Sequence, residues 1–206
     1  MMTPAVTKND VLVRSVDESV ETEQPSTLVR KLLFDPEILK NKRRDLFAVN
    51  SNLEEWMENY DMEKITAIRE NNLEKLRFIL ENGGNFNACN RNGETILHLA
   101  CRRGNLDVVR FLVDEAQVEI EVQDDLGRSV LHDICWRPYP DFELMEFIMG
   151  KVPPAFLLTE DRRGHTCFDY CRKQDWNQWN RFLHKHARSL QRRASLYNMI
   201  CQIAKD

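Results

Sequence analysis

Apolar residues in this chain recur as pairs of short clusters, and a turn separates the two clusters of each pair. In the stretch Asn92–Val113, a first cluster at Ile96, Leu97 and Leu99 is followed by glycine and asparagine, and a second cluster then runs to the end of the stretch. Spacings of three and four residues place each cluster on one face of a helix. The pattern therefore predicts two short helices joined by a tight turn.

The residues between the clusters predict where each helix begins and ends. Asn92-Gly93 favours a tight turn because glycine accepts a positive φ, and the hydroxyl of Thr95 follows at a position that can cap a helix. Gly104 is suited to end the first helix. Two helices of this length cannot bury their apolar faces alone, so the unit requires stacked neighbours.

Copies of this unit are present on both sides of it. Asp125–Trp136 repeats the order of glycine, hydroxyl residue, apolar residues and Leu-His, and its Gly127 follows Gly93 by 127 − 93 = 34 residues. Arg162–Lys173 repeats the order again, and Ala67–Gly83 aligns with the second half of the unit. A fixed period of this length indicates a helical repeat array, here with four units.

Three of these units resemble the T-P-L-H-x-A-A-x-x-G signature of the ankyrin-repeat family, in the segments TILHLACRRG, SVLHDICWRP and TCFDYCRKQD. In that family the histidine joins the turn of one repeat to the next, so the resemblance implies structural roles for His98 and His132 rather than general-base catalysis. The fourth unit carries Asp169 instead. The residues that the resemblance implies to be structural are Gly93, Thr95, Leu97, His98, Ala100, Gly104, Gly127, Ser129, Leu131, His132, Gly164 and Thr166.

These observations predict an all-α fold, a helical solenoid of about four ankyrin-like helix–turn–helix repeats with short hairpin-type turns. Residues 1–50 are polar and lack a long period, and we interpret them as a disordered or partly helical N-terminal arm. Residues 51–61 predict a capping helix that seals the open end of the stack. Residues 62–183 form the repeat stack, and residues 184–206 form a basic C-terminal helix.

The C-terminal helix has an apolar seam with a period of about 3.5 residues, formed by Leu183, Ala187, Leu190, Ala194, Tyr197 and Cys201. The seam is explained either by packing on the last repeat or by a coiled-coil dimer, and we favour packing because two alanines make a weak dimer seam. Its cations suggest an alternative function, the binding of a polyanion such as nucleic acid or anionic phospholipid. Ser195 follows two arginines and is a possible phosphorylation site.

Composition narrows the class of protein. The chain has 206 residues, of which 42% are hydrophobic, and a formal net charge of −4, as in ordinary soluble domains. It has no apolar run of about 20 residues, no secretory signal pattern, and acids near the N-terminus that organelle transit peptides avoid. Six cysteines without framework spacing fit reduced thiols. We expect a monomer located in the cytoplasm, the nucleus or both.

Motifs for catalysis are missing from the sequence, which has no G-x-S-x-G, no phosphate-binding glycine loop and no H-E-x-x-H. Cys167 and Cys171 beside His165 suggest a zinc site, but both cysteines align with small or apolar core positions of the other units. We therefore expect no enzyme activity, no cofactor and no metal. An unrecognised enzyme is the third function class, and a cleft lined by perturbed acids or histidines would reveal it.

The concave face of the solenoid is the predicted binding site, because in the ankyrin arrangement the turns and the exposed ends of the first helices line it. We expect this face to bind an acidic or phosphorylated segment of another protein, with Trp136 as the anchor and the compensating acids on the outer face. The alternative is a solvated face whose charges pair locally. The predicted binding residues are Arg91, Glu94, Arg102, Arg103, Arg128, Trp136, Arg137, Arg162, Arg163, His165 and Lys173, with Arg69 from the first unit.

The alignment of Cys171 with Ala100 and Ile134 leads to a first prediction. Because all three positions belong to the packed core, Cys171→Ala should lower the free energy of unfolding by no more than about 1 kcal/mol. Metal analysis of the purified protein should find no stoichiometric zinc. One equivalent of zinc, lost together with the fold on chelation, would contradict the prediction.

Overall fold

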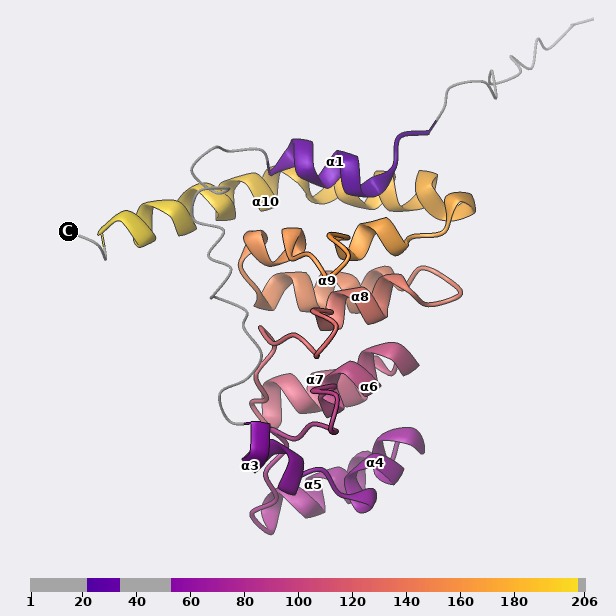
Figure 1. Cartoon of the computed structure of the whole chain (residues 1–206), viewed down its shortest axis with the longest axis vertical. Helices are drawn as coiled ribbons and strands as arrows, with labels where there is room; N and C mark the ends of the chain where they lie inside the picture. Colours follow the sequence, from indigo (N-terminus) through magenta and orange to yellow (C-terminus); the bar gives the residue numbers. More distant parts are fainter. Residues whose placement is uncertain (1–21, 34–52, 204–206) are drawn as a thin grey trace, which may run out of the picture.

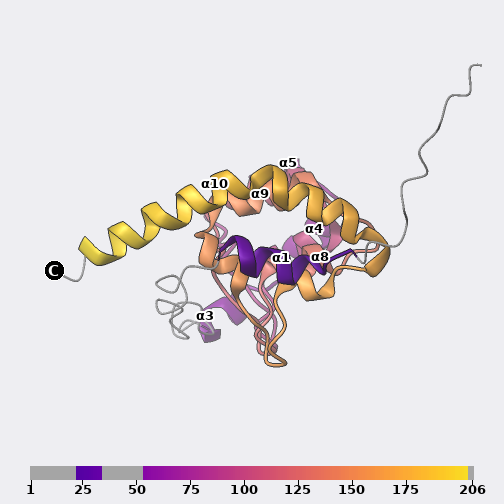
Figure 2. The same ribbon diagram turned by 90° about the horizontal axis from the view of Figure 1, so that it is seen from above.

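The protein is described from a computed structural model, which places residues 22–33 and 53–203, with side chains as far as residue 200. Within these ranges all regular elements are helices, and three isolated β-bridges close the hairpin turns between the repeats. Figure 1 shows the helices stacked along the long axis of the molecule, and Figure 2 shows the hairpins projecting from one side of the stack. The all-α solenoid predicted from the sequence is confirmed.

Four units make up the stack. The first unit consists of α4 (Met62–Arg69) and α5 (Leu73–Glu81), and the second of α6 (Ile96–Arg103), α7 (Leu106–Arg110) and the π-helical continuation η1 (Phe111–Glu115). The third unit consists of α8 (Val130–Cys135), α9 (Phe142–Lys151) and η2 (Pro154–Leu158). The fourth unit consists of η3 (Cys167–Tyr170), η4 (Lys173–Asp175) and α10 (Trp176–Ile203).

The caps of these helices lie where the sequence predicts them. The side chain of Thr95 accepts a hydrogen bond from the backbone N–H of His98, and Gly104 ends α6 in the left-handed conformation with φ 71°. Asp141 caps α9 by accepting from the N–H of Leu144 at 3.1 Å. A single apolar core then runs from α4 to α10, so each short helix is stabilised by burial against its neighbours.

The fourth unit departs from the helix–turn–helix pattern. Its first helix is reduced to the 3₁₀ turn η3, and α10 runs without a break through residues 183 and 184, where we predicted a boundary between the stack and the C-terminal helix. The apolar seam packs inside the molecule, because Leu183, Leu190 and Ala194 are all buried. No helix among the described residues is long and apolar enough to cross a membrane.

A helix from the N-terminal region, α1 (Pro25–Leu32), lies along α10 and against η3 at the C-terminal end of the stack (Figures 1 and 2). Leu28 and Val29 join the main core, and Asn180 donates to the carbonyl of Glu23 at 2.8 Å. We predicted that this region is part of an N-terminal arm outside the stack. In the structure, residues 22–33 instead cover the end of the stack. The sequence does not reveal this role, because the segment forms only two helical turns with few apolar residues.

Asp169 is the main polar contact between this cover and the stack. Its carboxylate accepts hydrogen bonds from the N–H of Thr166 at 2.8 Å and from the side chain of Gln24 at 3.2 Å, and it lies 3.6 Å from Arg30. Burial alone would raise the pKa of Asp169, but hydrogen bonds from Ser26 and Thr166 outweigh it and hold the pKa below its ordinary value. The carboxylate is therefore ionised when α1 is docked.

The helix α3 (Leu53–Glu58) occupies a different place from the one predicted. We expected it to seal the open end of the stack, but its one buried side chain, Trp56, packs against Cys89 and Val122 in the segments that lead to two hairpins. The backbone N–H of Cys89 donates to the carbonyl of Trp56 at 3.0 Å. The rest of the N-terminal arm lies outside the described residues.

The cover formed by α1 leads to a second prediction. Leu28→Ala removes a buried side chain and should lower the free energy of unfolding by about 2 kcal/mol or more, while Thr27→Ala, at an exposed position of the same helix, should have little effect. Chemical denaturation of both variants measures the difference. Equal stability of the two variants would show that α1 does not contribute to the folded stack.

Candidate functional site

Two buried histidines join neighbouring repeats. Nδ1 of His98 accepts from the backbone N–H of Thr95 at 3.2 Å, so the ring proton is on Nε2, which donates to the carbonyl of Arg128 in the next hairpin at 3.1 Å. His132 repeats this arrangement with the carbonyl of His165 at 3.2 Å. The family resemblance implied structural roles for these histidines, and in the structure each one joins its own unit to the next hairpin.

Backbone hydrogen bonds also connect the hairpins to one another. The N–H of Asp125 donates to the carbonyl of Asn92 at 3.0 Å, and the N–H of Arg162 donates to the carbonyl of Leu126 at 2.9 Å. Together with the histidine contacts, these bonds hold three successive hairpins in a row. Side chains from separate units are thereby presented on one surface.

A network of ion pairs occupies the centre of this surface. Glu94 lies 2.6 Å from Arg102 and 3.2 Å from Arg128, Arg102 also donates to Asp133 at 2.8 Å, and Arg128 pairs with the buried Asp124 at 2.6 Å. Burial alone would raise the pKa of Glu94, but hydrogen bonds from Arg102 and Asn90 keep it below the ordinary value. These two arginines thus have acidic partners within the stack, so the surface is less positive than we expected.

Two more of the predicted binding residues have structural contacts. Arg137 pairs with Asp141, and its guanidinium packs directly over Gly104, where a side chain on residue 104 would collide with it. Arg103 donates to the carbonyl of Arg69 at 3.2 Å and so connects the second unit to the first. The predicted contribution of Arg137 to an open binding face is not supported by this half-buried position.

Trp136, Tyr170 and His165 form an aromatic cluster that we call the Trp136 platform. The rings of Trp136 and Tyr170 are stacked with centroids 5.0 Å apart, and His165 meets Tyr170 edge-on at 5.8 Å. The hydroxyl of Tyr170 donates to Asp161, and burial together with this carboxylate raises the pKa of Tyr170 to about 12. The platform is firmly supported, yet 56% of Trp136 is exposed to solvent.

A recess of about 190 Å³ lies beside the indole of Trp136, lined by Arg102, Arg128, His132 and Asp133. This volume is below the range of about 300–1,000 Å³ that is typical of small-molecule sites. It suits one side chain of a docked peptide better than a free metabolite.

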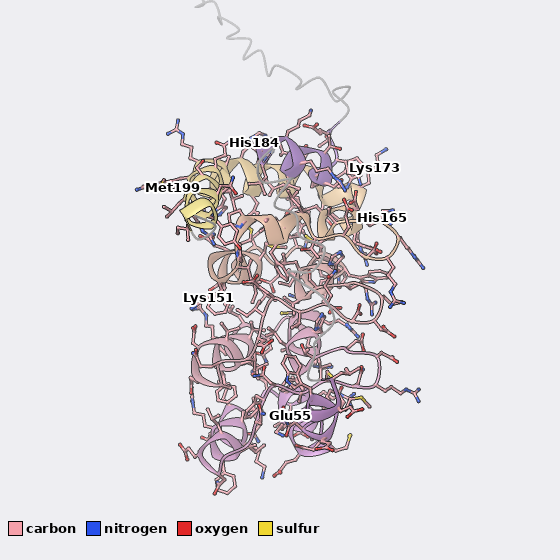
Figure 3. All side chains as sticks on the ribbon, turned by 60° about the vertical axis from the view of Figure 1, so that its left-hand side comes forward. Glu55, Lys151, His165, Lys173, His184 and Met199 are labelled. Atoms are coloured by element: carbon pink, nitrogen blue, oxygen red, sulfur yellow. The ribbon has the colours of Figure 1, made fainter. Side chains whose placement is uncertain are left out.

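Six predicted binding cations are exposed and form no ion pair with any residue that the structure describes. They are Arg69, Arg91, Arg103, Arg162, Arg163 and Lys173. Arg163 is close enough to Tyr170 to oppose the rise in its pKa. Figure 3 shows His165 and Lys173 on the same side of the stack, which places exposed positive charge next to the Trp136 platform.

Acids on the outer side of the second helices pair with cations of neighbouring units. Arg77 of α5 contacts Glu115 at 2.8 Å, Lys151 of α9 contacts Asp114 at 2.5 Å, and Arg110 lies 3.6 Å from Glu143. Our expectation that the compensating acids lie on the second helices is therefore incomplete. Glu94, Asp124, Asp133 and Asp141 compensate arginines on the hairpin side.

The cysteines near the predicted zinc site are core residues. Cys135, Cys167 and Cys171 are buried, the thiol of Cys135 lies within hydrogen-bonding reach of the other two, and burial raises its pKa well above the ordinary value. Among the described residues, no group of three or more His, Cys, Asp and Glu side chains is arranged to hold a metal ion. Ser195 lies exposed on α10, with its hydroxyl donating to the carbonyl of Gln191 at 3.1 Å.

Sequence reasoning missed Tyr170 and Asp133 as members of this surface. Tyr170 belongs to the 3₁₀ turn of the irregular fourth unit, where the repeat pattern no longer places side chains. Asp133 lies inside the short helix α8, and only its distance to Arg102 identifies its role. A search for aromatic residues one repeat after Trp136 could have found Tyr170.

Comparisons with known proteins match the chain in its repeat region. Residues 65–151 match the family described as "Ankyrin repeats (3 copies)". SMC5-SMC6 complex localization factor protein 1 is 32% identical in Mus musculus and 33% identical in Bos taurus over 76 residues, which is 37% of this chain and 7% of each relative. Alpha-latroinsectotoxin-Lt1a of Latrodectus tredecimguttatus is 30% identical over 82 residues, or 39% of this chain and 6% of the toxin. The matched part is therefore a small fraction of these relatives.

The His132 contact leads to a third prediction. Burial lowers the pKa of His132 below its ordinary value of 6.5, so the unfolded chain binds this proton more readily than the folded one. The contribution of His132 to stability should be complete above about pH 6.5 and should be lost as the pH falls from there through the folded pKa.

Urea denaturation between about pH 7 and pH 5 tests this linkage. The free energy of unfolding should fall with pH in the wild type and fall less steeply in His132→Gln, which cannot titrate there. The same pH dependence in both proteins would contradict the assignment.

Proposed function

Since this chain contains ankyrin repeats, we propose that it is a non-catalytic module that binds another protein at the Trp136 platform. Ankyrin repeats suggest protein–protein interaction, and the recess beside Trp136 has room for a side chain of a partner. The relatives share only a small part of their length with this chain, so the proposal is based on the repeats and their surface.

The exposed indole of Trp136 is the observation that supports this proposal most strongly. Large aromatic side chains that are held rigidly at a surface are frequent anchors of protein interfaces. Trp136 is stacked on Tyr170 and adjoins a recess with polar walls. A partner that covers this indole would remove its apolar area from water without first having to order it.

We further propose that the partner segment is acidic or phosphorylated, as the sequence suggested. Support comes from Arg162 and Arg163 at the tip of the last hairpin and from Arg91 and Lys173, which are exposed and have no ion-pair partner among the described residues. Arginine suits this role because its planar guanidinium binds carboxylate or phosphate through two hydrogen bonds. Arg102 and Arg128 line the recess beside Trp136 and are already paired with Asp133 and Asp124.

A capture experiment tests this function. The wild type, Trp136→Ala and the double variant Arg162→Glu with Arg163→Glu are compared for proteins retained from a lysate, with Arg188→Glu and Arg192→Glu on α10 as a control that carries the same charge change. Trp136→Ala should weaken binding by about 2 kcal/mol or more, or about 30-fold. The hairpin variant should lose the same partners, and the control should keep them.

Phosphatase treatment of the lysate distinguishes the two kinds of partner. Loss of binding after treatment indicates a phosphorylated segment, and retention indicates carboxylates. All variants must first show the melting temperature of the wild type, because these side chains are exposed and should not affect folding. If both site variants retain the same proteins as the wild type at physiological salt, the platform is not the binding site.

A further inference from the structure

A second surface lies on α10, away from the Trp136 platform. Its residues follow one another at spacings of three and four along one face of the helix, and we call them the α10 track: Arg181, Lys185, Arg188, Arg192, Leu196 and Met199. All six are exposed, whereas Leu183, Leu190 and Ala194 on the other face are buried against the stack. The helix therefore presents a continuous row of side chains that its own fold does not cover.

The track begins in a groove between α9 and α10 with a volume of about 470 Å³. The rings of Phe142 and Phe182 are stacked there with centroids 5.2 Å apart and form an apolar floor. One wall carries Arg181 and Lys185, and the other carries Glu143 and Glu146. These acids already have cationic neighbours, because Glu143 lies 3.6 Å from Arg110 and Glu146 lies 3.6 Å from Lys185.

The track ends on an apolar patch. Leu196, Met199 and Ile200 are 53%, 54% and 56% exposed, and they lie on the part of α10 that extends beyond the stack in Figures 1 and 2. Single exposed apolar residues are common at protein surfaces. Three neighbouring exposed apolar residues form a patch that a partner could cover, because the stack packs against the opposite face of the helix.

Arg188 and Arg192 lie between the groove and the patch, and neither forms an ion pair with a described residue. The neighbouring Arg193 behaves differently, since its guanidinium donates to the carbonyls of Met149 at 2.8 Å and Val152 at 2.5 Å. Arg193 therefore holds α10 against the end of α9. Arg188 and Arg192 make no such contact within the described part of the chain.

We propose that the α10 track binds an acidic amphipathic helix of another protein. Such a helix would place apolar side chains in the Phe142–Phe182 groove and on Leu196 and Met199, with carboxylates opposite Arg188 and Arg192 in between. From Arg181 to Met199 the track is about 27 Å long, a distance that a helix of about 20 residues spans. The order of apolar, cationic and apolar contacts also determines the complementary order on the partner.

The shape of the surface favours a helix over an anionic membrane as the occupant. A flat bilayer does not reach the floor of a groove, whereas single side chains projecting from a helix can enter it. Figure 3 shows Met199 and His165 on opposite sides of the stack, so the track and the Trp136 platform are separate surfaces. The inference therefore does not depend on the function proposed for the platform.

The test uses a fluorescent peptide of about 20 residues with leucine at the two core positions of each heptad and glutamate beside them. A second peptide of the same length has lysine in place of glutamate. Anisotropy titrations compare the wild type with two double variants, Arg188→Glu with Arg192→Glu and Met199→Ser with Ile200→Ser. Lys75→Glu with Arg77→Glu on α5, in the first unit of the stack, serves as a control with the same change of charge.

The acidic peptide should bind the wild type, and each α10 variant should weaken binding by about tenfold or more because it removes charge or apolar complementarity. The α5 control should bind as the wild type does, and the lysine peptide should not bind. Absence of binding to the wild type, or equal binding to all variants, would overturn the proposal. A vesicle experiment could also overturn the proposal. If the wild type sediments with phosphatidylcholine–phosphatidylserine vesicles and the Arg188→Glu, Arg192→Glu variant does not, an anionic membrane is the occupant.

Discussion

The arrangement of the binding face depends on a hydrogen bond from a buried imidazole to the backbone of the next repeat. The helices α4 to α9 are too short to form a stable core in pairs, so apolar packing brings the units together. Apolar contact is not directional, however. The bonds from His98 to Arg128 and from His132 to His165 are directional, and they set each hairpin against its neighbour. Trp136, Tyr170 and the tip of the last hairpin acquire their relative positions through the second of these bonds.

In the last unit of the stack, a hydrogen-bond acceptor, Asp169, stands at the position of the donating histidine. A neutral imidazole suits a contact with a carbonyl of a following repeat, but among the described residues α1, and not another repeat, covers the fourth unit. Asp169 takes the place of the histidine there and accepts hydrogen bonds from the segment that leads into α1. The beginning of the chain thus covers the final repeat, and α10 completes the cover through Arg193. A solenoid needs such covers because its terminal units otherwise expose apolar faces.

The repeats could be predicted from the sequence, whereas the covers and the ion pairs could not. Gly93, Thr95 and His98 recur at the same positions of the next unit as Gly127, Ser129 and His132, so their spacing is visible in the sequence and identifies the fold. The contact between α1 and α10 joins residues more than 140 positions apart and leaves no periodic pattern. Arg102 and Arg128 have acidic partners in other turns and helices, so the positive charge that we predicted for them was overestimated. Trp136 was predicted as an anchor from its place in the repeat, and its stacking on Tyr170 required the structure.

The central claim is that a partner protein covers Trp136, and site-specific photocrosslinking tests it even while the partner is unidentified. A photoreactive phenylalanine analogue is placed at Trp136, and separately at Phe78, an exposed aromatic residue of α5. Irradiation in a lysate should yield a discrete crosslinked protein from position 136 that is not obtained from position 78. Crosslinks of equal yield and identity from both positions, or none from position 136, would contradict the account.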